Sequence, residues 1–336
     1  MVNGLTGPIF VSLGVSALVT AGVIRVYRLL GWLDDPRQKR HPKVVHTYPV
    51  PRGGGIPILI AVAVAAATFL GVDRHILGIL TGALVLTIVG VMDDRWDLNP
   101  YLRLGLGVVA ALMVVGAGIR IDFITNPWGG VINLQSWQAD IFAVVWMVWL
   151  MNMVNWSKGV DGQLPGIVAV AAITIGLLSL RFSADVASWP VTILAMVVAG
   201  AYLGFLPFNM YPQKIMPGYG GGALGGYFLA VLAILSTAKV GTALVVLGVP
   251  LVDAGYVMMR RLWAGRSPVW GDRSHLHHKL MDVGWGKRRI AAFYWGITAI
   301  LGLVALSLNA QQKVYTIVTL AVVLGGWLLW LKRWSF

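Results

Sequence analysis

Repeated apolar segments of about twenty residues dominate this sequence and restrict the environments in which it can fold. Each segment is long enough to cross the hydrocarbon core of a lipid bilayer. Hydrophobic residues make up 58% of the 336 residues and charged residues only 12%, whereas a soluble domain carries about 25% charged residues. A water-soluble core cannot hold so much apolar sequence. We therefore predict an all-α polytopic integral membrane protein with a single membrane-embedded domain over residues 1–336.

About eleven transmembrane helices are predicted. They lie near residues 8–30, 54–72, 76–92, 103–119, 138–155, 164–181, 188–208, 221–237, 240–259, 290–308 and 314–331. The first apolar run has no basic segment before it and no small-residue cleavage site after it, so we expect a retained helix and not a signal peptide. Among the loops on the side away from the C-terminus, only 120–137 is long enough for a hairpin or an interfacial excursion.

Basic residues are concentrated in two predicted loops. Residues 31–53 and 260–289 carry 13 of the 26 Lys and Arg residues, and an odd number of spans places both on the side of the C-terminus. An excess of Lys and Arg marks the cytoplasmic side of a membrane protein. We therefore expect a multi-pass cell-membrane protein with a cytoplasmic C-terminus. This placement accounts for the net charge of +13, so we expect no nucleic-acid partner.

Polar residues that can do chemistry gather in the loops on that same side. Asp93 and Asp94 directly follow an apolar run, at a depth where an unpaired carboxylate costs a few kcal/mol. Such a pair can hold a divalent cation, or one member can act as a base. The alternative is a helix end that emerges into water, with Arg95 neutralising one charge.

The next polar loop combines amides, a carboxylate and glycines. Asn152, Asn155 and Asp161 lie where a span breaks at Gly159 and Gly162. Asparagine side chains can hydrogen-bond a nucleobase or a sugar, although helix capping and a glycine turn explain the same pattern. A binding role and a structural role both stay open here.

Three closely spaced histidines lie in the basic loop near the C-terminal end. His275, His277 and His278 have cationic neighbours, and the chain has no cysteine, so zinc is disfavoured and phosphate is favoured. A polybasic loop on anionic lipid is the alternative. The glycine runs 53–55 and 220–222 could admit a phosphate, but in membrane proteins glycines equally mark close helix contacts.

Taken together, the motifs resemble the polyprenyl-phosphate N-acetylhexosamine-1-phosphate transferases, which are of the glycosyltransferase family 4 type. The resemblance covers almost the whole chain, and its pieces occur in order. They are Asp35-Pro36 with His46 and Pro49-Val-Pro51-Arg52-Gly-Gly; Asp93-Asp94; Asn152-x-x-Asn155 with Gly159-Val-Asp161-Gly162; Asn209-x-x-Pro212-x-Lys214; Pro250-x-x-Asp253; and Ser267-Pro268 through Asp272-Arg273-x-His275-Leu-His277-His278. The last piece resembles the branch that uses simple UDP-N-acetylhexosamines.

The resemblance implies a helical fold with a cytoplasm-facing active-site cleft. There a polyprenyl phosphate such as undecaprenyl phosphate attacks the β-phosphate of a UDP-sugar, releases UMP and starts a lipid-linked glycan for the cell wall. It further implies Mg²⁺ as cofactor, and homodimers occur in this family. Catalytic roles are implied for Asp93, Asp94 and Asp161, the first two being metal ligands as well. Substrate contacts are implied for Lys43, His46, Asn155, Lys158, Asn209, Asp253, Arg273, His275, His277 and His278.

Several residues depart from the family pattern, Gln163 and Pro165 among them, and two of the departures matter. Lys158 stands where the family has aspartate, and Tyr219 stands where the family has an aspartate that binds magnesium. A neutral phenol is a poor ligand for a hard cation. We therefore consider an active transferase with a rebuilt site, in which Asp93, Asp94 and Asp161 hold a metal differently or Lys158 replaces part of the metal's positive charge. The alternatives are a catalytically silent relative that binds lipid phosphate or nucleotide sugar as a partner or regulatory subunit, and a transporter on a similar scaffold.

Overall fold

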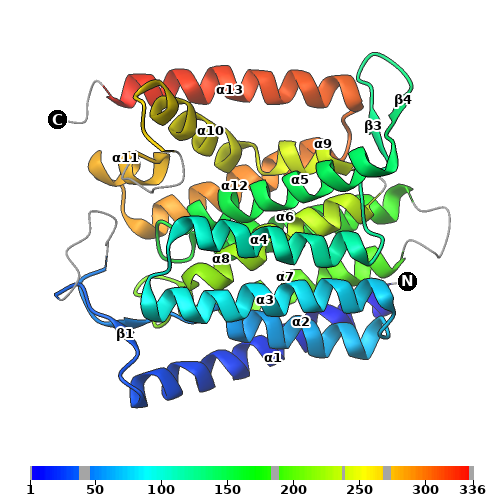
Figure 1. Ribbon diagram of the computed structural model, residues 1–336. Helices are drawn as coiled ribbons and strands as arrows, with labels where there is room; N and C mark the ends of the chain where they lie inside the picture. Colours follow the sequence, from blue (N-terminus) through cyan, green and yellow to red (C-terminus); the bar gives the residue numbers. More distant parts are fainter. Residues whose placement is uncertain (1, 38–45, 183–188, 237–238, 268–273, 333–336) are drawn as a thin grey trace.

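The structure, a computed structural model, is a bundle of α-helices and confirms the predicted all-α class (Figure 1). It describes residues 2–37, 46–182, 189–236, 239–267 and 274–332. The helices are α1 (Val2–Leu29), α2 (Gly55–Phe69), α3 (Arg74–Trp96), α4 (Pro100–Gly116), α5 (Ser136–Trp156), α6 (Gln163–Phe182), α7 (Trp189–Asn209), α8 (Gly218–Leu235), α9 (Lys239–Val246), α10 (Gly248–Trp263), α11 (Leu276–Asp282), α12 (Lys287–Ala305) and α13 (Ala310–Lys332).

Each predicted span coincides with a helix or with a helix pair. Within the described residues, eight helices are long and apolar enough to cross a membrane. A ninth candidate is the pair α9 and α10, which is bent by 85° at a short break. Helices α2 and α4, with 15 and 17 residues, are shorter. The multi-pass architecture is thus confirmed, while the number eleven stays a prediction.

Two small antiparallel sheets lie at opposite ends of the bundle (Figure 1). Strands β3 (Phe123–Thr125) and β4 (Val131–Asn133) form a hairpin within residues 120–137, which is one of the two possibilities considered for this loop. At the other end, β1 (Leu33–Asp34) pairs with β2 (Val50–Pro51). The last residue of β2 also bonds to the segment before α8, because Met216 N–H donates to the Pro51 carbonyl at 2.8 Å.

Helix α8 lies at the centre of the bundle, and 89% of its 18 residues are buried. Its glycines allow this, because a Cβ at Gly90 of α3 would overlap the backbone of Gly220, and a Cβ at Gly55 of α2 would lie 3.1 Å from it. Small residues let helix backbones approach closely. The glycine runs therefore serve as close helix contacts, which was one of the two interpretations of the sequence.

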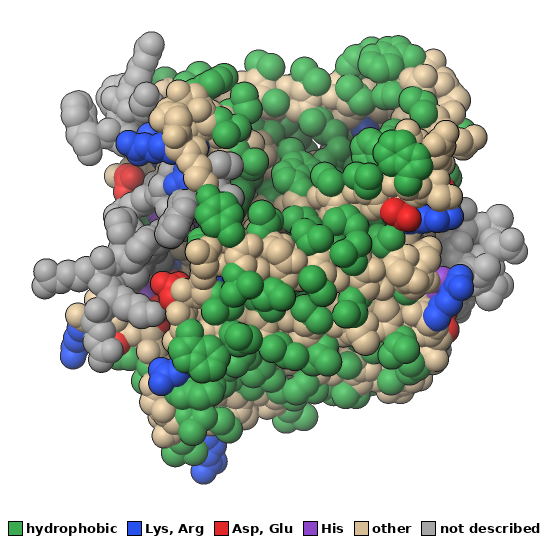
Figure 2. Space-filling model, viewed as in Figure 1, with side chains coloured by type: hydrophobic (Ala, Val, Ile, Leu, Met, Phe, Trp, Pro, Cys, Tyr) green, Lys and Arg blue, Asp and Glu red, His purple; other side chains and the backbone are tan. Residues whose placement is uncertain are grey.

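Charged side chains lie mainly at the two ends of the bundle, and apolar side chains cover its middle (Figure 2). This distribution is typical of a protein that crosses a bilayer, where every helix must be apolar at mid-depth. The polar loops singled out in the sequence, including β1, β2 and α11, lie at one end, away from the start of α1 (Figure 1). The fold therefore gathers them on one side of the membrane.

Candidate functional site

The two neighbouring carboxylates at the end of α3 have different partners. Asp93 is 2% exposed, and both of its oxygens accept hydrogen bonds from Arg103 Nη1, at 2.9 and 3.1 Å. Arg103 lies in the first turn of α4, the next helix along the chain. A buried carboxylate needs such a partner because an unpaired charge is costly away from water. Asp93 therefore ties α3 to α4 at the site.

Asp94 faces the start of α8. Its Oδ1 accepts a hydrogen bond from the Tyr219 backbone N–H at 3.0 Å and lies 3.5 Å from Arg52 Nε. Arg52 in turn lies 3.7 Å from Asp34. Gly218 has a φ of +66°, and a Cβ there would overlap the Asp94 carboxylate, so this position requires glycine for two reasons. The carboxylate is thus held at a helix N-terminus, where the helix dipole favours negative charge.

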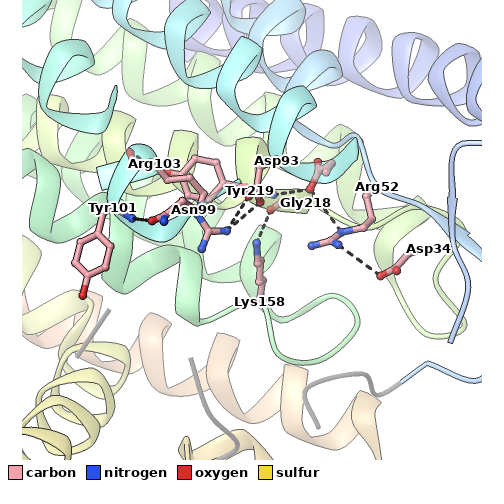
Figure 3. A network of polar contacts seen from close by, with 10 residues as sticks. Asp34, Arg52, Asp93, Asn99, Tyr101, Arg103, Lys158, Gly218 and Tyr219 are labelled. Atoms are coloured by element: carbon pink, nitrogen blue, oxygen red, sulfur yellow. Dashed lines mark hydrogen bonds and ion pairs between the residues drawn. The ribbon is translucent and has the colours of Figure 1, made fainter. Parts of the chain in front are cut away.

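Lys158 joins this network from the loop between α5 and α6. Its Nζ donates a hydrogen bond to the Gly218 carbonyl at 2.7 Å (Figure 3). Burial lowers the pKa of Lys158 to about 7, although the negative charge of Asp94 acts in the opposite direction. The structure thus brings Lys158 into the electrostatic field of the carboxylate pair.

The same loop makes a second polar contact, with the start of α12, through Asp161. Asp161 is 3% exposed and accepts hydrogen bonds from Lys287 Nζ at 3.2 Å and from the Gln213 backbone N–H at 3.4 Å. The adjacent Gly162 N–H donates to Asn209 Oδ1 at 3.1 Å. Asp161 and Asn209 therefore belong to one contact between the α5–α6 loop, the end of α7 and the start of α12.

The histidines form a buried group on α11 and just before it. His275 Nδ1 lies 2.9 Å from Asp253 Oδ2, and Asp253 Oδ1 accepts the Leu276 N–H at 2.7 Å. His277 stacks on His275 with ring centroids 5.5 Å apart. Burial, together with the neighbouring histidines, lowers the pKa of His277 well below its ordinary value. A Cβ at Gly159 would overlap the His277 ring, so this group packs directly on the α5–α6 loop.

The remaining predicted site residues lie around these contacts or outside the described residues. His278 is 3% exposed, with its ring 4.2 Å from that of His277. His46 Nε2 lies 3.3 Å from a backbone carbonyl oxygen of β1. Asn155 Oδ1 is buried against α8 and has no hydrogen-bond partner within the described part of the chain. Lys43 and Arg273 lie outside the described residues.

The described residues do not suit the Mg²⁺ ion that the resemblance implies. Mg²⁺ is usually held through one or two carboxylates together with waters and substrate phosphates, but both carboxylates of α3 already have cationic partners, Arg103 at Asp93 and Arg52 at 3.5 Å from Asp94. In the described ranges, moreover, no three His, Cys, Asp or Glu side chains are grouped to hold a metal ion. The Asp93 carboxylate is engaged by Arg103, and the Lys158 ammonium acts on Asp93 and Asp94 together. The groups around Asp93 and Asp94 are therefore cations and carboxylates paired with them, and not a set of free oxygen ligands.

Two cations that sequence analysis did not single out complete these contacts. Arg103 pairs with Asp93 and Lys287 pairs with Asp161. Each lies in the first turn of a helix, where the helix dipole disfavours positive charge. A cation in the first turn of an otherwise apolar helix is therefore the signal that points to a carboxylate partner elsewhere in the fold.

The sequence is similar to known transferases. Residues 76–237 match the family described as glycosyl transferase family 4. A decaprenyl-phosphate N-acetylglucosaminephosphotransferase of Mycobacterium leprae is 31% identical over 76% of this chain and 73% of its own, and the protein of that name from Mycolicibacterium smegmatis is 30% identical over 84% and 79%. A probable undecaprenyl-phosphate N-acetylglucosaminyl 1-phosphate transferase of Bacillus subtilis is 28% identical over 87% and 83%. The chain therefore belongs to glycosyl transferase family 4.

Proposed function

We propose that this protein transfers an N-acetylhexosamine 1-phosphate from a UDP-sugar to a polyprenyl phosphate in the cell membrane. An oxygen of the lipid phosphate forms a bond to the β-phosphorus of the UDP-sugar. The bond from that phosphorus to the bridging oxygen breaks, and UMP leaves. The product is a polyprenyl-diphospho-sugar, on which a lipid-linked glycan can be built.

The observation that carries this proposal is the contact of one loop with three groups of polar residues in a chain whose relatives are such transferases. The α5–α6 loop meets the start of α8, beside the carboxylate pair, through Lys158, the histidine group through Gly159, and α12 through Asp161. Phosphoryl transfer depends chiefly on positioning and on neutralising phosphate charge. Cations and carboxylates at one end of a membrane-spanning bundle suit a reaction between a lipid phosphate and a soluble nucleotide.

Within this proposal the two carboxylates of α3 have different tasks. Asp93 is engaged by Arg103, so we assign it to positioning. Asp94 is held by a backbone N–H, with Arg52 at 3.5 Å, and we assign it to accept a proton from the lipid phosphate or to orient that phosphate. His275, His277 and Asn209 are assigned to the UDP-sugar side.

The sidedness and the assembly belong to the proposal as well. The end of the bundle that holds Asp94 and α11 faces the cytoplasm, because the predicted basic loops lie at that end. A homodimer is expected from the resemblance. Cysteine-scanning accessibility in whole cells, made simple by the absence of native cysteine, tests the orientation, and the mass of the protein in nanodiscs tests the assembly.

The deciding experiment measures UMP release by the purified protein in nanodiscs that contain undecaprenyl phosphate. A panel of UDP-N-acetylhexosamines is supplied, and Asp94→Asn serves as the inactive control. Turnover that depends on the lipid and is lost in Asp94→Asn supports the transferase. Saturable nucleotide binding without UMP release from any donor would replace it with the silent relative.

A further inference from the structure

Three cationic side chains from separate parts of the fold converge beside the carboxylate pair at the end of α3. Arg52 follows β2, Lys158 belongs to the α5–α6 loop, and Arg103 lies in the first turn of α4. Figure 3 shows their charged groups directed toward the same space near Gly218. Like charges repel strongly where water is scarce, so this arrangement is favourable only with anions close by.

The carboxylates use only part of the hydrogen-bonding capacity of these cations. An ammonium group has three N–H donors, and among the described residues the Lys158 ammonium donates one hydrogen bond, to the Gly218 carbonyl. Both hydrogen bonds from Arg103 to Asp93 come from Nη1, whereas a guanidinium has five N–H donors. Lys158 and Arg103 therefore keep donors for a further anion.

Arg52 adds a third charge whose contacts are loose. It lies 3.5 Å from Asp94 and 3.7 Å from Asp34, which are distances of ion pairs and not of short hydrogen bonds. Burial acts against its charge, but Asp94 and Asp34 outweigh burial and raise the pKa of Arg52. Lys158 shows the opposite balance, because burial lowers its pKa to about 7 despite the charge of Asp94. An incoming phosphate would favour the protonated form of Lys158.

We infer that Arg52, Lys158 and Arg103 form a fixed cation site for the phosphate groups at the reacting centre, so that transfer proceeds without a divalent metal ion. The inference rests on the proposed transferase function. Arginine offers paired donors to phosphate oxygens and lysine offers a compact charge. Together they supply the charge neutralisation that phosphoryl transfer requires, at a place where the described side chains form no metal-ligand cluster.

The first test compares UMP release in EDTA and in Mg²⁺, with the same nanodiscs and the same UDP-sugar. We expect the two rates to agree within about twofold. A loss of about tenfold or more in EDTA that Mg²⁺ restores would overturn the cation site and leave the transferase proposal intact. Absence of UMP in both conditions would instead defeat the transferase proposal. The cation site would then be tested by the binding measurements below.

The binding test separates the two sources of phosphate. Calorimetry in EDTA measures UDP-N-acetylglucosamine with nanodiscs that lack undecaprenyl phosphate, and a second titration measures undecaprenyl phosphate without nucleotide. Lys158→Gln should weaken at least one of the two by about tenfold or more, and Lys158→Arg should retain most of the affinity. Arg95→Gln is the matched control, since Arg95 is an exposed cation near the same helix end that lies over the Trp32 ring. Equal binding by wild type and Lys158→Gln would overturn the inference.

A gain-of-metal variant gives a readout that does not depend on turnover. Carboxylates introduced at positions 158 and 219 would lie close to the Asp94 carboxylate. The Tyr219 N–H donates a hydrogen bond to Asp94, and the Lys158 ammonium donates one to the neighbouring Gly218 carbonyl. Three carboxylates can hold a hard cation. We expect electron paramagnetic resonance to detect one bound Mn²⁺ in Lys158→Asp/Tyr219→Asp and none in the wild type. A wild-type Mn²⁺ signal that is lost in Asp94→Asn would contradict the inference.

Discussion

Replacing Arg103 by alanine would leave the Asp93 carboxylate buried beside a space instead of a cation. Asp93 is 2% exposed and its oxygens lie 2.9 and 3.1 Å from Arg103 Nη1. At about 3 Å and an effective dielectric constant near 20, the attraction between two unit charges is about 5 kcal/mol. The Lys158 ammonium acts on the same carboxylate, and the carboxylate can take up a proton. We therefore expect a loss of about 3 kcal/mol in the free energy of unfolding, at the lower end for a broken buried pair.

The assay is reversible unfolding by SDS in mixed micelles, followed by the fluorescence of the fifteen tryptophans. The double variant Arg103→Gln/Asp93→Asn removes both charges at similar volume and should recover most of the lost stability, because no charge is then left unpaired. Arg95→Ala, an exposed cation, should change the free energy by less than about 0.5 kcal/mol. The reasoning is wrong if Arg103→Ala costs under about 1 kcal/mol, or if the double variant is as unstable as the single one.

Three further outcomes are expected. Gly159→Ala should lower the free energy of unfolding by about 1–3 kcal/mol, because its Cβ would overlap the His277 ring. Gly296 has open space around it, so Gly296→Ala should be neutral in the same SDS assay. Asp253→Asn should cost about 1–3 kcal/mol, because one buried acceptor becomes a donor, and an unchanged thermal unfolding midpoint would contradict this. With a lowered pKa of about 7, Lys158 is charged below that pH and neutral above it, so the affinity for the phosphate ligand that Lys158→Gln weakens should fall about tenfold from pH 6 to pH 8. The Lys158→Arg variant should show a flat profile, since arginine stays protonated, and parallel profiles would refute the assignment.

The helices were the most predictable part of the fold. Apolar runs of bilayer length identified every long helix within the described residues, because a membrane leaves few other options for a backbone. The 85° bend between α9 and α10 was not predicted, since the apolar run 240–259 is continuous in the sequence. Hydropathy reports how long an apolar segment is and whether it lies in lipid or in water. It carries no information on the direction of the helix axis.

The carboxylates and histidines of the candidate site could be singled out from the sequence, whereas Arg103, Lys287 and the pairings could not. The carboxylates and histidines stood out because polar residues are rare in this chain. Two of the partners come from distant segments: Arg52 lies 42 residues from Asp94, and Lys287 lies 126 residues from Asp161. No local pattern encodes such distances.

The sequence by itself determined the solvent of this protein, its family and the residue types that reach the site. Those properties follow from composition and from motifs, which are local. Only the tertiary structure decided that Asp93 and Asp94, adjacent in the chain, serve different partners, and that Lys158 enters the space beside them. The physical reason is that successive helix residues point about 100° apart, so each carboxylate meets whichever helix or loop the bundle places on its side.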